Sequence, residues 1–384
     1  MMRILHLCLG CFYVDNHSYQ ENMLPKYHKR LGHDVFIIAS TLSFDKNGNA
    51  CNVVPGRYDN EYGIPVRRLA YKRHLPVSLA KFLRLYEPFM DTVEEIRPDI
   101  IFIHGCQFLD IYRLLPYLRK NKVIVYVDNH ADFSNSATNF LSKNILHKFL
   151  WRRCAKAVEP FTRTFYGVLP ARVDFLKDIY HLPEKKVKLL VMGVDDEMVE
   201  ALNGCRKSFH DRHGIKDETV IITGGKIDES KTQVITFLKL MHEQADASVK
   251  VLVFGSIIPG MKDEVLSLCD GERIKYLGWL DHPHIYEALI SSDLAVYPGR
   301  HSVLWEETVG IGLPMVVKRW DGTTHVDLGG NVLFLDDDSK DTLKKAMTVA
   351  LANLGKMKKV AQEKGRMVFS YRNIALRAIQ DEKA

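Results

Sequence analysis

The sequence predicts an α/β protein built of two doubly wound, Rossmann-like domains. The chain has 384 residues, which is long for one hydrophobic core and suits two domains. Short apolar runs alternate with amphipathic helical stretches, as buried parallel strands and their crossover helices do, and this alternation occurs twice. The charge also divides: residues 1–190 hold 28 Lys and Arg against 18 Asp and Glu, and the remainder holds 25 against 29.

The first half supplies the first of these domains. Its apolar runs have the usual length of buried strands, and a helical pattern follows the first run. Cys8 and Cys11 form a C-x-x-C where the first strand ends; we interpret them as small residues there, with a redox pair as the alternative. The predicted elements are strands over Arg3–Leu9, Asp34–Ala39, Asp99–Ile103 and Lys122–Val127, and a helix over Glu21–Leu31.

The second half repeats the pattern of strand and helix. Strands are predicted over Thr219–Thr223, Val249–Phe254, Ile274–Leu277, Leu294–Tyr297 and Pro314–Val317. Helices are predicted over Lys231–Gln244, Asp263–Leu268, Pro283–Ile290, Glu306–Gly310 and Ser339–Leu354, and the tail from Gly355 also has a helical pattern.

We expect the domain boundary near Val191–Asp195, where a glycine separates two apolar runs and the sign of the charge changes close by. This gives an N-terminal domain at 1–192 and a C-terminal domain at 193–365. A C-terminal helix at 366–384 could cross back to the N-terminal domain. Ligands of doubly wound folds bind outside the C-terminal ends of the strands, so a cleft between the two domains is the predicted site.

Composition argues against several classes of protein. No apolar run reaches the roughly 20 residues that span a bilayer. The apolar start MMRILHLCLGCF is interpreted as a buried strand rather than a signal peptide, so a cytoplasmic protein is expected. The seven cysteines are odd in number and scattered, unlike a disulfide framework. The basic first half favours an anionic partner; without a nucleic-acid-binding motif, anionic lipid and phosphorylated glycan are favoured over nucleic acid.

The segment Val220–Gln233 is a candidate phosphate site. It reads VIITGGKIDESKTQ, a strand that ends in Gly224 and Gly225 before a helix begins. Glycines allow close approach of the backbone, and the start of a helix offers free N–H groups. Lys226 and Lys231 flank that start and could hold a diphosphate. The alternative is a tight turn with two solvated lysines.

This segment resembles the G-R-x-x-x-x-K-G motif of retaining glycosyltransferases of family 4, which have the GT-B fold. Lys226 falls at the motif's arginine, after Gly225, and Lys231 falls at its lysine; the family uses this pair on the donor diphosphate. Lysine keeps the charge of arginine but loses its planar fork. Other stretches resemble motifs of the family in the same order, namely LGHDVFIIAS, RPDIIFIHG, VIVYVDNHAD, MGVD and YLGW.

Two of these stretches carry further site predictions. Within YLGW, Leu277 and Gly278 resemble the residues beside the nucleobase. Within VIVYVDNHAD, His130 resembles the histidine near the donor sugar and is predicted to be catalytic; the alternative is a hydrogen-bonded structural histidine. Asp132 could orient His130 or cap a helix. His104 is expected to support the floor of the cleft.

The segment Tyr297–Val317, YPGRHSVLWEETVGIGLPMVV, resembles the E-A-M-A-x-G-x-P-V-V motif of the family. Counting from the motif's glycine aligns Glu307, rather than Glu306, with the glutamate that holds the donor ribose. A carboxylate accepts two hydroxyl hydrogen bonds at once, which suits a ribose diol. The alternative is a carboxylate near a helix N-terminus, where the helix dipole favours it.

A second glutamate of the family, eight residues earlier, is replaced by Gly299. His301 and the backbone N–H groups of Ser302 and Val303 are the nearest substitutes. His301 is therefore predicted to be catalytic, because an imidazole titrates near neutrality and can hydrogen-bond a sugar or neutralise a leaving phosphate. Ser302 and Val303 join the predicted diphosphate-binding residues.

The resemblance implies a glycosyltransferase that moves a sugar, with retention, from a nucleotide-diphosphate sugar to a glycan or lipid-linked acceptor. A role in surface polysaccharide synthesis is expected with it. Fixed cations at the leaving diphosphate would stabilise the transition state. No cofactor and no metal are expected. Two alternatives stay open: a nucleotide-sugar epimerase of the same fold, and a GT-B subunit that binds nucleotide-sugar without turnover.

The segment Leu141–Val158 is a basic amphipathic helix by its spacing. Its apolar residues recur at helical intervals, with Lys143, Lys148 and Arg152 among the basic residues between them. One interpretation is a core-packed helix with a solvated face. The other is peripheral contact with the inner face of an anionic membrane, where lipid-linked acceptors reside.

Overall fold

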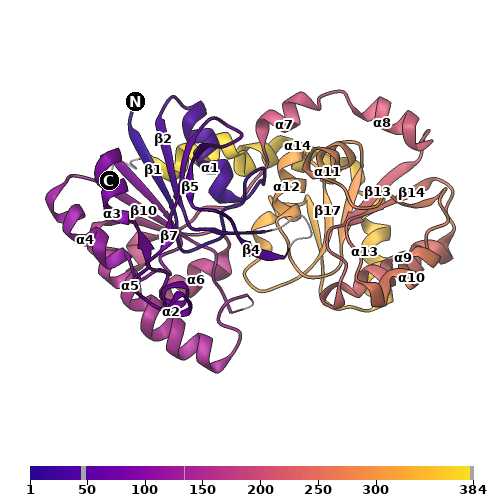
Figure 1. Ribbon diagram of the computed structural model, residues 1–384. Coiled ribbons are helices and arrows are strands. Elements are labelled where there is room, and N and C mark those ends of the chain that lie inside the picture. Colours follow the sequence, from indigo (N-terminus) through magenta and orange to yellow (C-terminus); the bar gives the residue numbers. More distant parts are fainter. Residues whose placement is uncertain (45–48, 134, 381–384) are drawn as a thin grey trace. The chain divides into compact units, whose positions relative to one another are not determined.

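The computed structural model describes residues 1–44, 49–133 and 135–380. Contacts within the chain divide it into two compact units, drawn in Figure 1. Unit 1 comprises Met1–Val191 and the segment from Ile374, and unit 2 comprises Met192–Asn373. Each unit has its own mostly parallel sheet with helices around it, so the predicted α/β, doubly wound fold class is confirmed.

The sheet of unit 1 has the strand order β12-β11-β10-β9-β1-β2-β6-β5, parallel except for the β5–β6 hairpin at one edge. The chain runs from β1 outward to β2 and later returns to β9 on the other side of β1. The C-terminal ends of β1 and β9 are thus the switch point at which doubly wound sheets bind ligands. The strands are β1 (Arg3–Cys8), β2 (Asp34–Ala39), β5 (Gly56–Asp59), β6 (Pro65–Arg68), β9 (Ile100–His104), β10 (Ile124–Asn129), β11 (Thr162–Gly167) and β12 (Val187–Leu189).

Alternate residues of β1 serve the two faces of this sheet, as the period of a strand requires. Leu5 and Leu7 join the large apolar core that also contains residues of α3, α4, α5 and α6. His6 faces the other way, toward α1 and α15. The helices are α1 (Gln20–Arg30), α2 (Val77–Leu83), α3 (Phe89–Ile96), α4 (Ile111–Lys120), the π-helix η1 (Leu141–Trp151), α5 (Arg152–Val158), η2 (Glu159–Phe161), α6 (Pro170–Asp178), η3 (Glu184–Lys186) and α15 (Tyr371–Ile379).

Two short antiparallel pairs complete unit 1. They are β3 (Leu42–Phe44) with β4 (Ala50–Asn52), and β7 (Ala70–Tyr71) with β8 (Tyr86–Glu87).

The sheet of unit 2 is parallel throughout, with the order β15-β14-β13-β16-β17-β18. This is the Rossmann order, and its switch point lies between β13 and β16. The strands are β13 (Thr219–Gly224), β14 (Val249–Phe254), β15 (Ile274–Tyr276), β16 (Leu294–Tyr297), β17 (Met315–Lys318) and β18 (Val332–Leu335). The helices are α7 (Asp196–Ala201), α8 (Arg206–His213), η4 (Glu229–Lys231), α9 (Gln233–Gln244), α10 (Pro259–Ser267), α11 (His282–Ile290), α12 (Leu304–Ile311), η5 (Thr324–Val326), α13 (Lys340–Ala352) and α14 (Leu354–Phe369).

Helix α12 is fixed by two glycines. A Cβ on Gly365 of α14 would lie 2.0 Å from the Val309 carbonyl oxygen, and a Cβ on Gly310 would lie 2.8 Å from a methyl group of Val194. Both separations are far below van der Waals contact, so α12 can lie this close only because these two residues have no side chain. The helix that carries Glu306 and Glu307 is therefore held in a set position within unit 2.

The observed elements differ from the predicted ones mainly at their ends. Helix α9 begins at Gln233, so Lys231 lies in the preceding turn η4 rather than in the predicted helix. The tail forms two helices, α14 and α15, and residues 381–384 of the predicted 366–384 helix lie outside the described residues. The β5–β6 hairpin, β11 and β12 were not predicted, because their apolar runs are short or interrupted by basic residues.

Candidate functional site

The switch point of unit 2 brings together several residues of the predicted diphosphate site. A small pocket of about 10 Å³ is lined by the end of β13, by Lys231 of η4, and by the residues that follow β16. Gly224 lies on one side of this pocket, and Gly299 and Ser302 lie on the other. The lining residues are Thr223, Gly224, Lys231, Val234, Tyr297, Pro298, Gly299, Arg300 and Ser302.

The close approach of the chain segments around this pocket requires glycine at three positions. Gly225 has a φ of +99°, a left-handed conformation that L side chains rarely adopt. A Cβ on Gly224 would lie 2.4 Å from the Phe254 carbonyl oxygen, and one on Gly299 would lie 2.9 Å from the Lys231 side chain. The glycine that replaces the family glutamate therefore makes room for Lys231.

The two predicted diphosphate lysines have different environments. Burial lowers the pKa of Lys231, and the nearby Lys226 ammonium lowers it further, while Asp228 opposes both. The Lys226 side chain is 71% exposed, and its Nζ lies 3.8 Å from an Asp228 oxygen. Only Lys231 of this pair lines the pocket described above.

Ser302 and Val303 immediately precede α12. The Ser302 carbonyl accepts from the Trp305 N–H at 3.0 Å, and the Val303 carbonyl accepts from the Glu307 N–H at 3.2 Å, so the chain enters α12 in a regular turn. Ser302 also lines the pocket with Lys231. A helix N-terminus and an ammonium group thus lie on the same side of unit 2, which is the electrostatic arrangement that suits a phosphate.

His301 is paired with Glu306, the neighbour of the glutamate that the sequence selected. Nε2 of His301 and Nε2 of His325 both lie 2.9 Å from Oε1 of Glu306. Glu306 is fully buried, which alone would raise the pKa of its carboxyl group. The two imidazoles outweigh burial and hold this pKa at about 2. Glu306 is a buried carboxylate that orients two histidines.

These three residues could also hold a metal ion. Their ligand atoms lie within 4.8 Å of one another, which is found for no other His, Cys, Asp or Glu group in the described parts of the chain. A metal on Nε2 of His325 would require a proton on Nδ1, and this atom is buried without a hydrogen-bond partner among the described residues. An orphaned donor there would be costly, whereas the hydrogen-bonded form leaves only a lone pair. The geometry therefore favours two hydrogen bonds over a metal centre.

Glu307, the predicted ribose residue, is also buried. Its Oε1 lies 3.1 Å from Nε2 of His282 and 3.4 Å from the Tyr286 hydroxyl, which donates to it. The side chain thus faces α11, away from the pair of histidines that Glu306 holds. A ribose diol would have to share Oε1 with these groups or use the other carboxylate oxygen.

The predicted nucleobase residues follow β15. Gly278 has a φ of +80°, and its carbonyl accepts from the Gly255 N–H at 2.8 Å. Leu277 borders a hollow of about 530 Å³ that is otherwise lined by residues of α8, the loop before α11, and α11. This hollow is large enough for a base, and Phe209 and His213 offer it rings.

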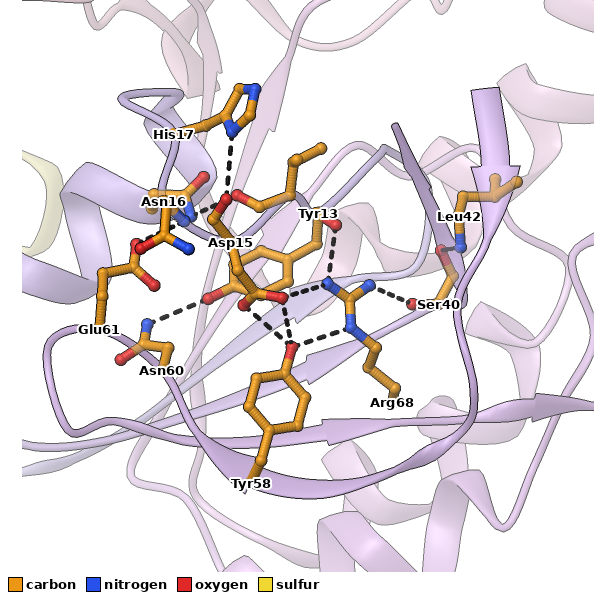
Figure 2. A network of polar contacts seen from close by, with 12 residues as sticks. Tyr13, Asp15, Asn16, His17, Ser40, Leu42, Tyr58, Asn60, Glu61 and Arg68 are labelled. Carbon is orange, nitrogen blue, oxygen red and sulfur yellow. Dashed lines mark hydrogen bonds and ion pairs between the residues drawn. The ribbon is translucent and has the colours of Figure 1, made fainter. Parts of the chain in front are cut away.

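In unit 1 the loop after β1 is held by Arg68 (Figure 2). The guanidinium donates to the carbonyl oxygens of Ser40 and Tyr13, each at 3.0 Å. It also donates to Asp15 at 3.0 Å and to the Tyr58 hydroxyl at 2.8 Å, and this hydroxyl donates to Asp15 in turn. The loop after β1 is thus anchored by a buried cation from β6.

The loops after β1 and β9 meet at the switch point of unit 1. A Cβ on Gly10 would lie 2.4 Å from the Gly105 carbonyl oxygen. Arg84 donates to the Gly10 carbonyl at 2.5 Å and to the Gln107 carbonyl at 2.8 Å. Arg84 thus holds the loops after β1 and β9 together. Strand β10, which precedes His130, pairs with β9 beside them.

His130 follows β10, as predicted, and its side chain is 29% exposed. Its Nε2 lies 3.6 Å from Oδ2 of the buried Asp128. The sequence left open whether Asp132 orients His130 or caps a helix. Asp132 accepts from Arg172 Nε at 3.1 Å and from the Asn135 N–H at 3.1 Å, and neither contact orients His130 or caps a helix.

Asp128 in turn belongs to a buried row of histidines. His104 Nδ1 lies 2.7 Å from Asp128 Oδ2, and His104 Nε2 lies 3.0 Å from His6 Nδ1. His6 Nε2 lies 3.0 Å from His28 Nδ1, and His28 Nε2 lies 3.1 Å from the Ala375 carbonyl oxygen of α15. These side chains are fully buried.

The basic helix divides into two parts. In η1 the apolar side chains of Leu141, Ile145 and Phe149 are more than half exposed, as is that of Phe140 before it. In α5 the side chains of Cys154 and Val158 are buried in the core. The core-packed interpretation is right for α5 and wrong for these residues of η1. No helix in the described ranges combines the length and apolar character needed to cross a membrane.

Sequence reasoning missed the partners of both predicted catalytic histidines. Glu306 was passed over because the motif alignment selects one glutamate of an adjacent pair. His325 is 24 residues from His301, in η5, and no motif signals it. Asp128 was not singled out within VIVYVDNHAD, although its place two residues before His130 is a spacing that a same-face partner on a strand would have.

Two Rossmann-like units with these strand orders have the GT-B fold. Solved structures agree over almost the whole chain. Sucrose-phosphate synthase from Thermosynechococcus elongatus has 15% sequence identity and a TM-score of 0.67, over 98% of this chain and 97% of that one. The HepE protein of Anabaena in complex with UDP also has 15% identity and a TM-score of 0.67, over 98% of both chains.

UDP-GlcNAc 2-epimerase from Neisseria meningitidis bound to UDP-GlcNAc is similar as well. It has 12% identity and a TM-score of 0.65, over 98% of this chain and 99% of that one. No protein-family model matches the sequence, and no curated protein sequence matches it significantly. At these identities the similarity establishes the fold.

Proposed function

We propose that this protein is a glycosyltransferase that moves a sugar from a nucleotide-diphosphate sugar to a glycan or lipid-linked acceptor. The observation that carries the proposal is the pocket at the switch point of unit 2. There Lys231, Ser302 and a run of close-packed glycines converge where a Rossmann sheet binds phosphates. HepE in complex with UDP, a protein of the same fold, supports a nucleotide ligand.

The proposed chemistry is stabilisation of the leaving diphosphate. Negative charge grows on the diphosphate as the anomeric bond breaks, and a fixed cation there stabilises the transition state more than the ground state. Lys231 is suited to this role because burial weakens its solvation and leaves its charge to the ligand. The exposed Lys226 would contribute as a weaker, solvent-screened charge.

His301 is proposed to take over the work of the missing family glutamate. Its Nε2 is engaged by Glu306, so its Nδ1 is left to accept from a hydroxyl of the donor sugar or, when protonated, to donate to a phosphate. A carboxylate-oriented imidazole has a fixed direction, which a loop histidine alone would lack. Glu307 is proposed to hold the ribose, and Leu277 and Gly278 to lie beside the base.

The finer assignments follow from the sequence resemblance. They are membership of retaining glycosyltransferase family 4, transfer with retention of a hexosyl group, catalysis that includes His130, and no requirement for a metal or other cofactor. Unit 1 is proposed to bind the acceptor, and a role in surface polysaccharide synthesis is proposed with it. The proposed setting is the cytoplasm.

Peripheral contact with an anionic membrane is proposed for η1. The exposed Phe140, Ile145 and Phe149 would enter the interface, and the basic residues between them would meet lipid phosphates. Arg153 lies 3.7 Å from the Phe149 ring centroid, so charge and apolar surface adjoin. Arg152 donates to the Ile179 carbonyl at 2.6 Å and serves the fold instead.

The membrane proposal is tested with Ile145→Ser/Phe149→Ser in sedimentation with vesicles that contain phosphatidylglycerol. We expect the parent to sediment at low salt and the variant to stay in solution. Met367→Ser, at a residue of α14 that is 69% exposed, is the control and should sediment like the parent. Equal sedimentation of all three proteins would remove η1 from the proposal.

Lys231→Ala tests the proposed donor site. Loss of one charge-assisted contact should weaken UDP or GDP binding by about 1.5–3 kcal/mol, and Lys226→Ala should cost less than 1 kcal/mol, roughly the value of an exposed ion pair. Calorimetry measures both. Lys239→Ala, an exposed lysine of α9 paired with Glu264, is the control and should bind like the parent. Unchanged affinity in Lys231→Ala would refute the site.

The second candidate function is that of an epimerase, which the similarity to UDP-GlcNAc 2-epimerase favours. Assays of the purified protein with and without an acceptor distinguish it from a glycosyltransferase. Proton NMR of UDP-GlcNAc incubated with the protein alone would show interconversion of the sugar if the protein is an epimerase. Transfer that requires an added acceptor supports the proposal. Nucleotide-sugar binding without either reaction would identify a non-catalytic subunit.

A further inference from the structure

The row of histidines in unit 1 is an unbroken linear series of four hydrogen bonds, which we call the histidine chain. It starts at the Ala375 carbonyl oxygen, runs through His28, His6 and His104, and ends at the Asp128 carboxylate, with separations of 3.1, 3.0, 3.0 and 2.7 Å. All four side chains are fully buried, so water cannot replace a missing link. Every link therefore needs its own hydrogen.

Counting hydrogens shows that the chain carries an additional proton. A carbonyl oxygen and a carboxylate only accept, and a neutral imidazole has one N–H and one bare nitrogen. Three neutral histidines supply three hydrogens for four links. A fourth proton must be present, either on one of the imidazoles or on Asp128. With it, the chain from Ala375 to Asp128 has no net charge.

The neighbouring groups decide where this proton lies. Burial opposes a charge on His104, but Asp128 outweighs burial and raises the pKa of His104 to about 9. Burial raises the pKa of Asp128, yet His104 and His130 outweigh it and lower that pKa. Burial lowers the pKa of His28 to about 3 and that of His6 well below 6.5. The fourth proton therefore belongs to His104, beside an ionised Asp128.

We propose that His6, His28 and His104 are positioning residues that act on His130 through Asp128. The imidazolium of His104 neutralises Asp128 from behind, so His130, whose Nε2 lies 3.6 Å from Asp128 Oδ2, faces a neutral ion pair instead of a lone carboxylate. This inference rests on the proposed part of His130 in sugar transfer. It adds that the charge beside His130 is set by a carbonyl at the far end of the chain, on α15.

Other ionisable groups face this chain from each element packed on it. Cys8 of β1 and Glu21 of α1 favour the charge on His104. His33, whose ring centroid lies 6.4 Å from that of His28, disfavours a charge there. Oδ1 of Asp128 and Nε2 of His130 have no hydrogen-bond partner among the described residues. Asp128 thus keeps an acceptor position and His130 a nitrogen that the fold does not use.

The far end of the chain offers a sharp test, because His28 can be replaced in two ways of similar size. Glutamine donates through its amide N–H to Ala375 and accepts from His6 through its oxygen, so four links and the fourth proton remain. Leucine removes two links. His6 and His104 then supply the two remaining hydrogens while both stay neutral, and the additional proton is no longer required.

The first arm measures protonation and does not depend on activity. Nitrogen-15 NMR of the imidazoles at pH 7.5 should show both nitrogens of His104 protonated in the parent and in His28→Gln. In His28→Leu, His104 should lose its second proton at a pH at least about one unit lower than in the parent. The control His33→Leu should match the parent. A singly protonated His104 in the parent, or the same behaviour in His28→Leu and His28→Gln, would overturn the inference.

The second arm measures transfer and tests the link to His130. His28→Leu should lower the single-turnover rate about tenfold while nucleotide affinity stays within about twofold, and His28→Gln should restore most of the rate. Equal rates in the two variants would refute the positioning role. If the parent transfers no sugar, the proposed function fails, and the NMR arm still decides whether the chain holds its fourth proton.

Discussion

Each unit buries a carboxylate that contacts more than one histidine or a row of histidines, and the two clusters have different hydrogen-bond patterns. In unit 1, His28, His6 and His104 stand in series between a carbonyl and Asp128. In unit 2, two histidines stand in parallel on a single oxygen of Glu306. Three histidines in series between two acceptors form four hydrogen bonds, one more than three neutral imidazoles can supply with hydrogens. Two histidines on one oxygen form two hydrogen bonds, so one hydrogen from each is enough.

The comparison teaches that the charge of a buried cluster follows from its connectivity, not from its composition. Asp128 is neutralised by a proton that the hydrogen-bond count demands. The two histidines hold the pKa of Glu306 at about 2, so it keeps its charge, and its second oxygen has no hydrogen-bond partner in the part of the chain that the structure describes. Loss of the imidazolium from the first cluster should therefore cost more than loss of the carboxylate from the second, because only the first change leaves an uncompensated buried charge.

The largest effect is therefore expected for His104→Leu. This variant removes the imidazolium and leaves Asp128 as an uncompensated buried charge, so unit 1 should lose about 3–5 kcal/mol of stability. Glu306→Gln, which strands no charge, should cost about 1–3 kcal/mol. Native-state hydrogen exchange of β9 and β10 against α12 assigns each loss to its unit. Equal losses would mean that connectivity does not set the charge.

A smaller effect is expected from pH. His104 has its pKa raised to about 9, so its stabilisation is complete below 6.5 and disappears as pH rises through 9. His28 has its pKa lowered to about 3, so stability falls as pH drops from 6.5 toward 3. Unit 1 should be most stable near pH 6.5 and lose about 2 kcal/mol between pH 7 and pH 9. Denaturant unfolding at each pH measures this.

The variant His28→Leu sharpens that prediction. It should flatten both sides of the stability curve, because His28 is absent and the hydrogen-bond chain no longer requires a second proton on His104. His284→Ala, at a surface histidine of α11 whose side chain is 63% exposed, should keep the shape of the parent curve. A parent curve that stays level between pH 7 and pH 9 would contradict a proton on His104.

The smallest effect is expected for His301→Ala, which removes one of the two donors to Glu306. Transfer should fall about tenfold, equal to about 1.4 kcal/mol, while affinity for the bare nucleoside diphosphate stays nearly unchanged because Lys231 holds the diphosphate. Single-turnover transfer and calorimetry measure the two quantities. His325→Ala should weaken transfer less, since His301 would keep its own bond to Glu306. Full activity in His301→Ala would exclude it from the site.

Much of the fold could be predicted because buried parallel strands appear in the sequence as short, continuous apolar runs. β2, β14 and β16 begin and end at the predicted residues, and most other predicted strands agree within two residues. The β5–β6 hairpin was missed because its strands alternate arginines with apolar residues and lie at a sheet edge. The break between η1 and α5 was missed because a π-helix has no signature in the spacing of apolar residues.

The candidate site was predictable where one short segment carries it. Gly225, Lys231 and Ser302 could be named because strand, glycine turn and helix start follow one another in the chain. The partners of His130 and His301 are different in kind. Whether Asp128 or Asp132 faces His130 depends on which way the chain turns after β10, and the contact between Glu306 and His325 depends on how η5 packs against α12. Such pairings are set by tertiary packing.

The return of the chain to unit 1 has a consequence for biosynthesis. The acceptor for His28 Nε2 is the carbonyl of Ala375, which the ribosome adds only after all of unit 2. During synthesis the sheet of unit 1 can pair its strands, but the last link of its buried histidine chain stays open until α15 arrives. Unit 2 is continuous in sequence and can finish first. The unit made first is thus completed last, and a ribosome stalled within α14 would hold a nascent chain whose His28 lacks its native partner.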